Sequence, residues 1–182
     1  YYGTINEYPD ATLITNDEET IDGELYQTNY LIKQKNFCKV GEIEYNSLQK
    51  AIDTIETSGE IEFIASISTK SPIEIPSNKN ITIDLKGFTY STTQSITTRG
   101  NLTIKDSSEE KTGTITTDQN INLLINYNNL NLESGNYTKT GEKKGYFVIN
   151  IPYGQISTTN IKNSKISSTD KGIYKYNNNG SY

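Results

Sequence analysis

Apolar and polar residues alternate over short stretches along most of this chain, and the stretches repeat. Four segments open with an asparagine followed by an apolar residue: Asn80-Ile-Thr-Ile-Asp-Leu, Asn101-Leu-Thr-Ile-Lys-Asp, Asn129-Leu-Asn-Leu-Glu-Ser and Asn160-Ile-Lys-Asn-Ser. The apolar residues at positions 81, 102, 130 and 161 are 21, 28 and 31 residues apart. Repeats of roughly 20 to 30 residues with variable loops are typical of a solenoid built from strands. The pattern therefore predicts an all-β fold, a right-handed parallel β-helix.

Each repeat divides into short strands. The strands LTIKD, GTITTD and INLLINY follow Asn101, and LNLES, GNYTKT and YFVINI follow Asn129. The last turn contains QISTTNIKNSKIS (155–167) and GIYKYN (172–177). Successive side chains of a strand point to opposite faces, so the alternation predicts which of them point inward. We expect three or four turns after about Ile61. The expected inward residues are Leu102, Ile104, Leu130, Leu132, Phe147 and Ile149, and one interior column is expected to contain Ile81, Ile83, Leu102, Ile104, Leu130, Leu132 and Ile161.

One segment has helical periodicity, from Asn46 to about Ser58. Its apolar residues Leu48, Ala51, Ile52 and Ile55 fall on one stripe of a helix. Asn46 is the expected N-cap, with Gln49 at the capping-box spacing, and Gly59 is the expected left-handed stop. The open end of a β-helix exposes core residues and strand edges, so we expect helix 46–58 to cap the N-terminal end.

The residues before the helix predict a separate organisation. YYGTI resembles the later Gly113-Thr-Ile, as the last turn of an upstream solenoid would. ATLITN (11–16) and ELYQTNYLIK (24–33) predict two strands, with Asp22-Gly23 as a hairpin turn between them, and 34–39 predicts a linker. We therefore expect residues 1–36 to be the end of an upstream module and residues 37–182 to be the β-helix domain. The pattern runs to both ends, so we expect a segment of a longer protein, truncated at the C-terminus, whose export signal and anchor lie outside it.

Composition narrows the range of partners. Hydrophobic residues make up 32% of the 182 residues, the net charge is −5, and Arg99 is the single arginine. This charge pattern lacks the basic stripe of a nucleic-acid-binding protein, so we expect no nucleic acid partner. The longest apolar stretch, at 146–151, is far shorter than the ~18 residues of a membrane helix, so we expect no membrane span in this segment. Cys38, the only cysteine, is expected to be a small buried apolar residue.

Three runs of sequence resemble a known family. They are Cys38-Lys-Val-Gly-Glu-Ile-Glu-Tyr-Asn-Ser-Leu-Gln-Lys-Ala-Ile-Asp, Gly59-Glu-Ile-Glu-Phe-Ile and Asn80-Ile-Thr-Ile-Asp-Leu-Lys-Gly. Together they resemble the pectate-lyase-like β-helix modules of Gram-positive surface and adhesin-like proteins, especially clostridial ones. The resemblance covers about Cys38 to Tyr182 and implies a β-helix at the cell wall or outside the cell. It implies no single activity, because such modules include polysaccharide lyases and hydrolases as well as non-enzymatic stalks and adhesins.

The ionisable residues favour a structural role over catalysis. The chain contains no histidine, which removes a histidine-based triad and histidine metal ligands. Arg99 stands in a Thr-Arg-Gly turn and is expected to be solvated. Asp84, Asp106 and Glu133 are expected at near-equivalent positions on or beside the outward face of successive turns, at a spacing that would suit a pair of catalytic carboxylates. Lysines are interleaved with them, and charges that alternate down a sheet are an ordinary device for solubility.

Metal binding has only weak candidates. Asp106, Glu109 and Glu110 place carboxylates in a loop, where oxygen ligands could hold calcium. Their spacing matches no established calcium loop, so a solvated loop is the preferred interpretation, and the same holds for residues 17–19. No metal or cofactor is expected. The asparagines at 80, 101, 129 and 160 are expected to form a hydrogen-bonded ladder rather than a binding strip.

Tyrosines are the more plausible binding residues. The later turns contain Tyr137, Tyr146, Tyr153, Tyr174 and Tyr176, and exposed rings stack on sugar faces, although tyrosine is also simply frequent in strands. The preferred hypothesis is a non-catalytic structural or adhesive module of a secreted bacterial cell-surface protein, with glycans or host surface proteins as partners. The alternative is a polysaccharide lyase or glycoside hydrolase of the β-helix type.

Overall fold

The chain divides into two compact units, Tyr1–Lys35 and Asn36–Tyr182. The computed structural model describes residues 11–21, 24–33 and 35–176, with side chains from residue 35 onward. In the first unit, β1 (Ala11–Ile21) and β2 (Glu24–Lys33) pair antiparallel, with a register shift between Thr15 and Glu18. The predicted hairpin is thus confirmed, with a longer first strand. The predictions for YYGTI and for a turn at Asp22-Gly23 lie outside the described residues.

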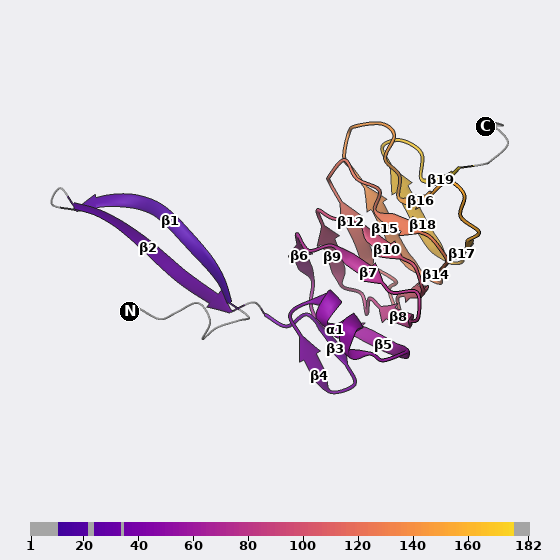
Figure 1. The fold of residues 1–182 in the computed structure, drawn as a ribbon, viewed down its shortest axis with the longest axis horizontal. Coiled ribbons are helices and arrows are strands. Elements are labelled where there is room, and N and C mark those ends of the chain that lie inside the picture. Colours follow the sequence, from indigo (N-terminus) through magenta and orange to yellow (C-terminus); the bar gives the residue numbers. More distant parts are fainter. Residues whose placement is uncertain (1–10, 22–23, 34, 177–182) are drawn as a thin grey trace. The chain divides into compact units, whose positions relative to one another are not determined.

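The second unit is a parallel β-solenoid of about five turns, so the predicted β-helix is confirmed. Figure 1 shows the strands of successive turns stacked in order from α1 towards β19. Parallel sheets need long connections, and here each connection passes through the two other sheets before the chain returns. The solenoid has about five turns rather than the three or four expected, because β5 (Ser58–Phe63) already begins the first turn.

Three sheets form the walls of the solenoid, and the strands of each are named in the order in which they are hydrogen-bonded to one another. Sheet 1 contains β17 (Thr158–Ile161), β14 (Asn129–Leu132), β11 (Asn101–Lys105), β8 (Asn80–Asp84), β5, β3 (Cys38–Val40) and β4 (Ile43–Tyr45). Sheet 2 contains β18 (Ser164–Ser168), β15 (Gly135–Lys139), β12 (Thr114–Thr117), β9 (Thr89–Thr92) and β6 (Ile67–Thr69). Sheet 3 contains β19 (Ile173–Lys175), β16 (Ile149–Ile151), β13 (Leu124–Asn126), β10 (Ile96–Thr98) and β7 (Ile73–Ile75).

The core is built from apolar columns that point inward from each sheet. In sheet 1, Ile104 is level with Ile83 on one side and Leu132 on the other, and all three side chains are at most 1% exposed. The six residues expected on the inward face are all buried. Each turn alone would leave its apolar face in water, and stacking removes that face from solvent.

The register expected for the last turn is wrong by two residues. Leu130 is level with Thr159, and Ile161 is level with Leu132 rather than with Leu130. Ile161 is also 37% exposed, so it is not an interior residue. It lies on β17, the end strand of sheet 1, and among the residues that the structure describes no strand lies beyond it.

A short helix and a strand pair cover the N-terminal end of the solenoid. The helix α1 (Leu48–Thr54) buries Leu48, Ala51 and Ile52 against the core. Beside it, β3 pairs antiparallel with β5 and with β4, which completes the edge of sheet 1. The predicted cap is confirmed, but the linker expected over 34–39 is wrong at its end, where β3 begins.

The bounds of the helix differ from those expected. Ser47, not Asn46, is the N-cap, and its hydroxyl accepts a hydrogen bond from the Lys50 N–H at 3.3 Å. Ile55 is the C-cap in extended conformation, so the helix ends at Thr54, five residues before Gly59. Gly59 lies within β5, where a Cβ atom would approach the Ile55 side chain to 3.0 Å. In the described part of the chain, no helix is long and apolar enough to cross a membrane.

Candidate functional site

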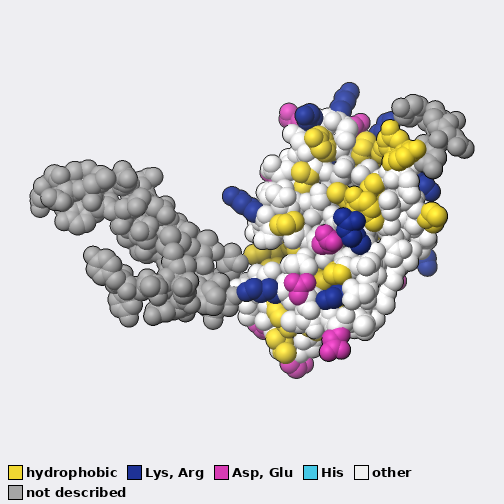
Figure 2. Space-filling view, viewed as in Figure 1, with side chains coloured by type: hydrophobic (Ala, Val, Ile, Leu, Met, Phe, Trp, Pro, Cys, Tyr) yellow, Lys and Arg dark blue, Asp and Glu magenta, His cyan; other side chains and the backbone are white. Residues whose placement is uncertain are grey.

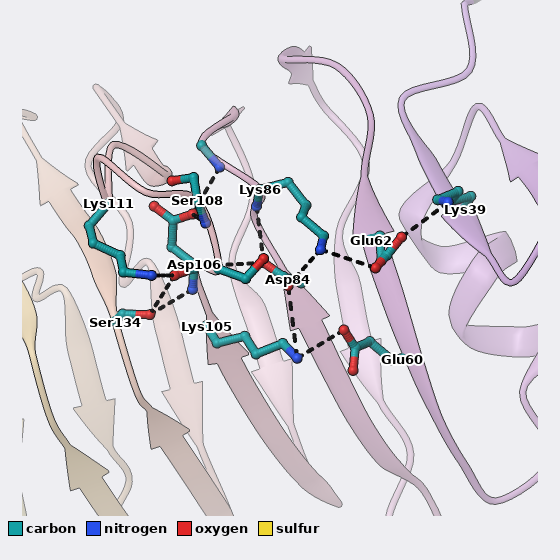
Figure 3. A network of polar contacts seen from close by, with 12 residues as sticks. Lys39, Glu60, Glu62, Asp84, Lys86, Lys105, Asp106, Ser108, Lys111 and Ser134 are labelled. Atoms are coloured by element: carbon teal, nitrogen blue, oxygen red, sulfur yellow. Dashed lines mark hydrogen bonds and ion pairs between the residues drawn. The ribbon is translucent and has the colours of Figure 1, made fainter.

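A network of charged side chains runs along the outer surface of sheet 1, as Figure 3 shows. Glu62, Asp84 and Lys105 occupy one outward column, because Glu62 is level with Asp84 and Asp84 is level with Lys105. The expected column of Asp84, Asp106 and Glu133 is therefore wrong at its middle member. Lys105 takes that place, and Asp106 lies one residue further along the chain.

Lysines alternate with carboxylates through this network. Lys39 pairs with Glu62 at 3.1 Å, and Lys86 pairs with Glu62 at 3.2 Å and with Asp84 at 3.5 Å. Lys105 pairs with Asp84 at 3.8 Å and with Glu60 at 2.9 Å. Together these five ion pairs link three turns of the solenoid. Apart from Asp84, these side chains are 30–43% exposed, so each pair by itself stabilises little. As a connected set, the pairs fix the lysine ammonium groups next to Asp84.

Asp84 is buried, which the alternation of its strand did not predict. Its carboxyl is 1% exposed, and Oδ1 accepts hydrogen bonds from the backbone N–H of Ser107 at 2.9 Å and of Lys86 at 3.1 Å. Oδ2 has no hydrogen-bond partner among the described residues and faces the two lysines. Burial by itself would raise the pKa of Asp84, but the hydrogen bonds from Ser107 and Lys86 and the charge of Lys86 together lower it below the usual value.

Asp106 anchors the loop that covers this surface. Its Oδ1 accepts from the N–H groups of Gly87 at 2.9 Å and Ser108 at 3.1 Å, and its Oδ2 accepts from Gly113 at 2.6 Å. A Cβ at residue 113 would lie 2.7 Å from the carboxylate, so this bond requires glycine. Asp106 is 1% exposed, which corrects its expected place on or beside a solvated outer face.

The metal candidates do not come together. The carboxylate of Asp106 is occupied by three backbone donors, whereas Glu109 and Glu110 are exposed. No three cysteine, aspartate or glutamate side chains of the described residues gather closely enough to hold a metal ion. Lys111 instead donates to the backbone carbonyl of Asp106 at 2.9 Å, which ties the loop to its own start.

Asparagines form the predicted ladder over three turns. Asn101 donates through Nδ2 to Oδ1 of Asn80, and Asn129 donates to Asn101 at 2.5 Å. Asn160 departs from the expectation, because it donates to Oδ1 of Asn131 at 2.8 Å instead of continuing from Asn129. The ladder fixes the register of the turns that it joins.

The structure separates the five tyrosines that were candidates for ligand binding. Tyr137 is 0% exposed in the core, and its hydroxyl donates to the Ser134 carbonyl at 2.9 Å, so it is out of reach of a surface ligand. Burial and, to a lesser degree, the charge of Asp106 raise the pKa of Tyr137. Tyr146 is half-buried and lies apart, with the Lys143 ammonium 5.9 Å from its ring centre.

The other three tyrosines meet on the surface with Phe147, and we call these four residues the aromatic cluster. Phe147 and Tyr174 are stacked with ring centres 4.5 Å apart and planes 8° apart. Tyr176 meets the edge of Tyr174 at 6.0 Å and of Tyr153 at 5.2 Å. Tyr153 is 61% exposed and Tyr176 is 52% exposed. Figure 2 shows hydrophobic side chains gathered on the surface near β16 and β19.

Just beyond two strands of sheet 3 lies an aromatic contact that strand alternation did not predict. The Arg99 guanidinium lies 4.6 Å from the ring centre of Tyr127, and its Nε donates to Glu74 at 3.1 Å. Arg99 is thus held on the surface between a ring and a carboxylate rather than left free in a turn. Its spacing from Tyr127, one turn later in the chain, was the available signal.

The arrangement as a whole holds loops and turns in place and exposes rings to solvent. Comparison with known proteins gives no match for this chain to a family model, a curated protein or a solved structure.

Proposed function

We propose that this chain is a non-catalytic structural and adhesive module of a secreted bacterial cell-surface protein, and that its aromatic cluster contacts glycans. The observation that carries the proposal is the exposure of Tyr153 and Tyr176 within an ordered group of rings. Large exposed aromatic side chains leave apolar surface in water, and an apolar patch with polar tips is typical of a binding surface.

The contacts among the four rings support an adhesive role. Rings held by edge and stacking contacts lose little conformational freedom when a ligand binds, so more of the contact energy appears as affinity. Phe147 connects the cluster to the solenoid, because it is 9% exposed while its ring stacks on Tyr174. The rings of the cluster are therefore in contact with one another before any ligand binds, and one of them is buried on the solenoid.

The structural roles of Asp84 and Asp106 support the non-catalytic part of the proposal. General acid–base chemistry uses a group that reaches the substrate and can exchange a proton. Asp106 accepts three backbone hydrogen bonds, and Asp84 lies buried against lysines that are themselves paired with Glu60 and Glu62. Both residues thus have a structural role, because they hold residues 84–87 and 106–113 together.

A polysaccharide lyase or hydrolase of the β-helix type is the second candidate. The observation in its favour is Asp84 Oδ2, a buried oxygen without a hydrogen bond that faces two lysines. We prefer the adhesive function because this oxygen is enclosed rather than open to a substrate. A location at the cell wall or outside the cell, in a Gram-positive bacterium, rests on the resemblance of three sequence runs to surface modules, and host surface proteins remain a further class of partner.

A glycan array tests the proposal. We expect the purified protein to bind a subset of immobilised glycans, and Tyr153→Ala and Tyr176→Ala each to weaken that binding about tenfold through loss of ring stacking. Tyr146→Ala is the matched control, because this half-buried tyrosine lies outside the aromatic cluster. Binding that is unaffected by both cluster variants, or no binding to any glycan, would contradict the proposal.

A further inference from the structure

A groove where the strands of sheet 2 end is lined almost entirely by serine and threonine residues. Its volume is about 340 Å³, and its lining residues come from four successive turns. Every lining side chain is a serine or threonine except Asp118. The outer surface of sheet 1, by contrast, presents the charged column of Glu62, Asp84 and Lys105.

Three of the lining residues form a regular column on the outer face of sheet 2. Ser68 is level with Ser91, and Ser91 is level with Thr116, so their side chains point outward from three neighbouring strands. Between them on the same strands, Tyr90 and Ile115 point inward and are 1% exposed. Neighbouring strands lie about 4.8 Å apart, which sets the spacing of the column. Within the described residues, no hydrogen bond engages the hydroxyls of Ser68, Ser91 or Thr116, so all three are available to a ligand.

One wall of the groove is held by the same local turn in three consecutive turns of the solenoid. The hydroxyl of Thr69 accepts from the N–H of Ser71 at 3.2 Å, and that of Thr92 accepts from Gln94 at 3.0 Å. The hydroxyl of Thr117 accepts from Gln119 at 3.1 Å. Such side-chain turns fix the backbone locally, so the groove is formed before any ligand arrives.

We propose that this groove binds an uncharged linear polysaccharide that lies along the axis of the solenoid. A hydroxyl group both donates and accepts hydrogen bonds, which suits the hydroxyls of a sugar. A site that repeats at every turn suits a polymer that repeats along its length, because several weak contacts then act together. Asp118 is the only ionisable residue of the lining, so an acidic polymer would meet repulsion and no cation.

This inference rests on the proposed function, since it assumes that the protein contacts glycans, and it adds a second site and the class of its ligand. The experiment is affinity gel electrophoresis in the presence of hydroxyethylcellulose, mixed-linkage β-glucan or polygalacturonate. We expect the uncharged polymers to retard the protein and polygalacturonate to have no effect. The double variant Ser91→Ala/Thr116→Val should bind the uncharged polymers about tenfold more weakly, because it removes two hydrogen-bonding groups and keeps the strand shape.

Thr82→Val is the matched control, because Thr82 is a half-buried threonine in the middle of β8 on sheet 1. It should bind as the unchanged protein does, and circular dichroism should show that both variants are folded. Tyr153→Ala separates the two proposals. Loss of retardation in Tyr153→Ala with retention in the double variant would overturn the groove and leave the aromatic cluster standing. Retardation by polygalacturonate alone, or by no polymer, would also overturn the groove, whereas tyrosine-dependent binding on the array would still support the proposed function.

Discussion

Gln49 completes the edge of sheet 3 by pairing with the backbone of Glu74. The Gln49 amide donates to the Glu74 carbonyl at 3.1 Å, and its oxygen accepts from the Glu74 N–H at 2.8 Å. These are the two bonds that a neighbouring strand would make, and β7, which contains Glu74, is the end strand of its sheet. The helix thus protects the solenoid twice, with apolar side chains over the core and with an amide on the strand edge.

Replacement of Gln49 tests this edge contact. We expect Gln49→Ala to lower the free energy of unfolding by about 1–2 kcal/mol, because it leaves the Glu74 N–H and carbonyl without their partner. Glu56→Gln is the control, since Glu56 is exposed just after the helix. Urea unfolding followed by circular dichroism measures both. An unfolding midpoint of Gln49→Ala equal to that of the unchanged protein would show that the edge needs no such protection.

The core columns predict a contrast between two isoleucines of sheet 1. Ile104→Asp should cost several kcal/mol, because it places an unpaired charge among side chains that exclude water. Ile161→Asp should cost much less, because Ile161 is 37% exposed at the end of the same column. Thermal unfolding of the two variants provides the comparison. Similar losses of stability in both would mean that the column is not the core of the fold.

The fold could be predicted because each repeat begins with an asparagine and continues as a short strand of alternating apolar and polar residues. An asparagine before an alternating strand identified three turns correctly, and Asn80, Asn101 and Asn129 do form a ladder. The predicted register of the last turn was wrong because Asn131-Leu132 repeats the pattern of Asn129-Leu130 two residues later. Two registers therefore fit the sequence equally, and the structure adopts the second, with Asn160 on Asn131.

The site was harder to predict because burial depends on loops as well as on strand alternation. Asp84 occupies an outward position, and only the loop from Asp106 to Gly113 and the neighbouring lysines enclose it. The burial of Tyr137 could have been predicted from the sequence. Gly135-Asn-Tyr aligns with Gly113-Thr-Ile, so Tyr137 is level with the inward Ile115. The aromatic cluster joins residues from different turns through loop geometry that no alternation encodes.

Asp84 makes the stability of the folded protein depend on pH under acidic conditions. Burial would raise its pKa, but hydrogen bonds from Ser107 and Lys86 and the charge of Lys86 outweigh it, so folding lowers the pKa from the ordinary 3.8. The folded protein therefore binds this proton less tightly than the unfolded chain does. The resulting stability is complete above the ordinary pKa and is lost as the pH falls through the lower, folded value.

Asp84→Asn tests this dependence. At pH 7 we expect it to lower the free energy of unfolding by about 1–3 kcal/mol, and we expect the difference from the unchanged protein to shrink below pH 4. Glu133→Gln is the control, since Glu133 is level with Lys105 but exposed. Urea unfolding at a series of pH values measures the difference. A loss that stays constant from neutral to acid pH would exclude the ionised carboxylate as its source.

The Cys38 thiol should be unreactive towards thiol reagents in the folded protein. The thiol is 0% exposed and its Sγ donates to the Tyr45 carbonyl at 3.8 Å, and burial raises its pKa to about 12. The thiolate is the reactive form, so little of it exists at pH 8. A thiol-specific chromophoric reagent should label Cys38 only after unfolding in urea. Rapid labelling of the native protein would show that β3 opens readily.

An assay for polysaccharide cleavage by the purified protein decides whether this chain is catalytic. Pectin-like polymers are incubated with and without calcium, and unsaturated sugar products are followed by their ultraviolet absorbance. Because Asp84 and Asp106 are occupied in holding loops together, we expect no product under either condition, even where the glycan array shows binding. Calcium-dependent release of unsaturated sugars, abolished by replacement of Asp84, Asp106 or Arg99, would contradict this expectation and establish a lyase.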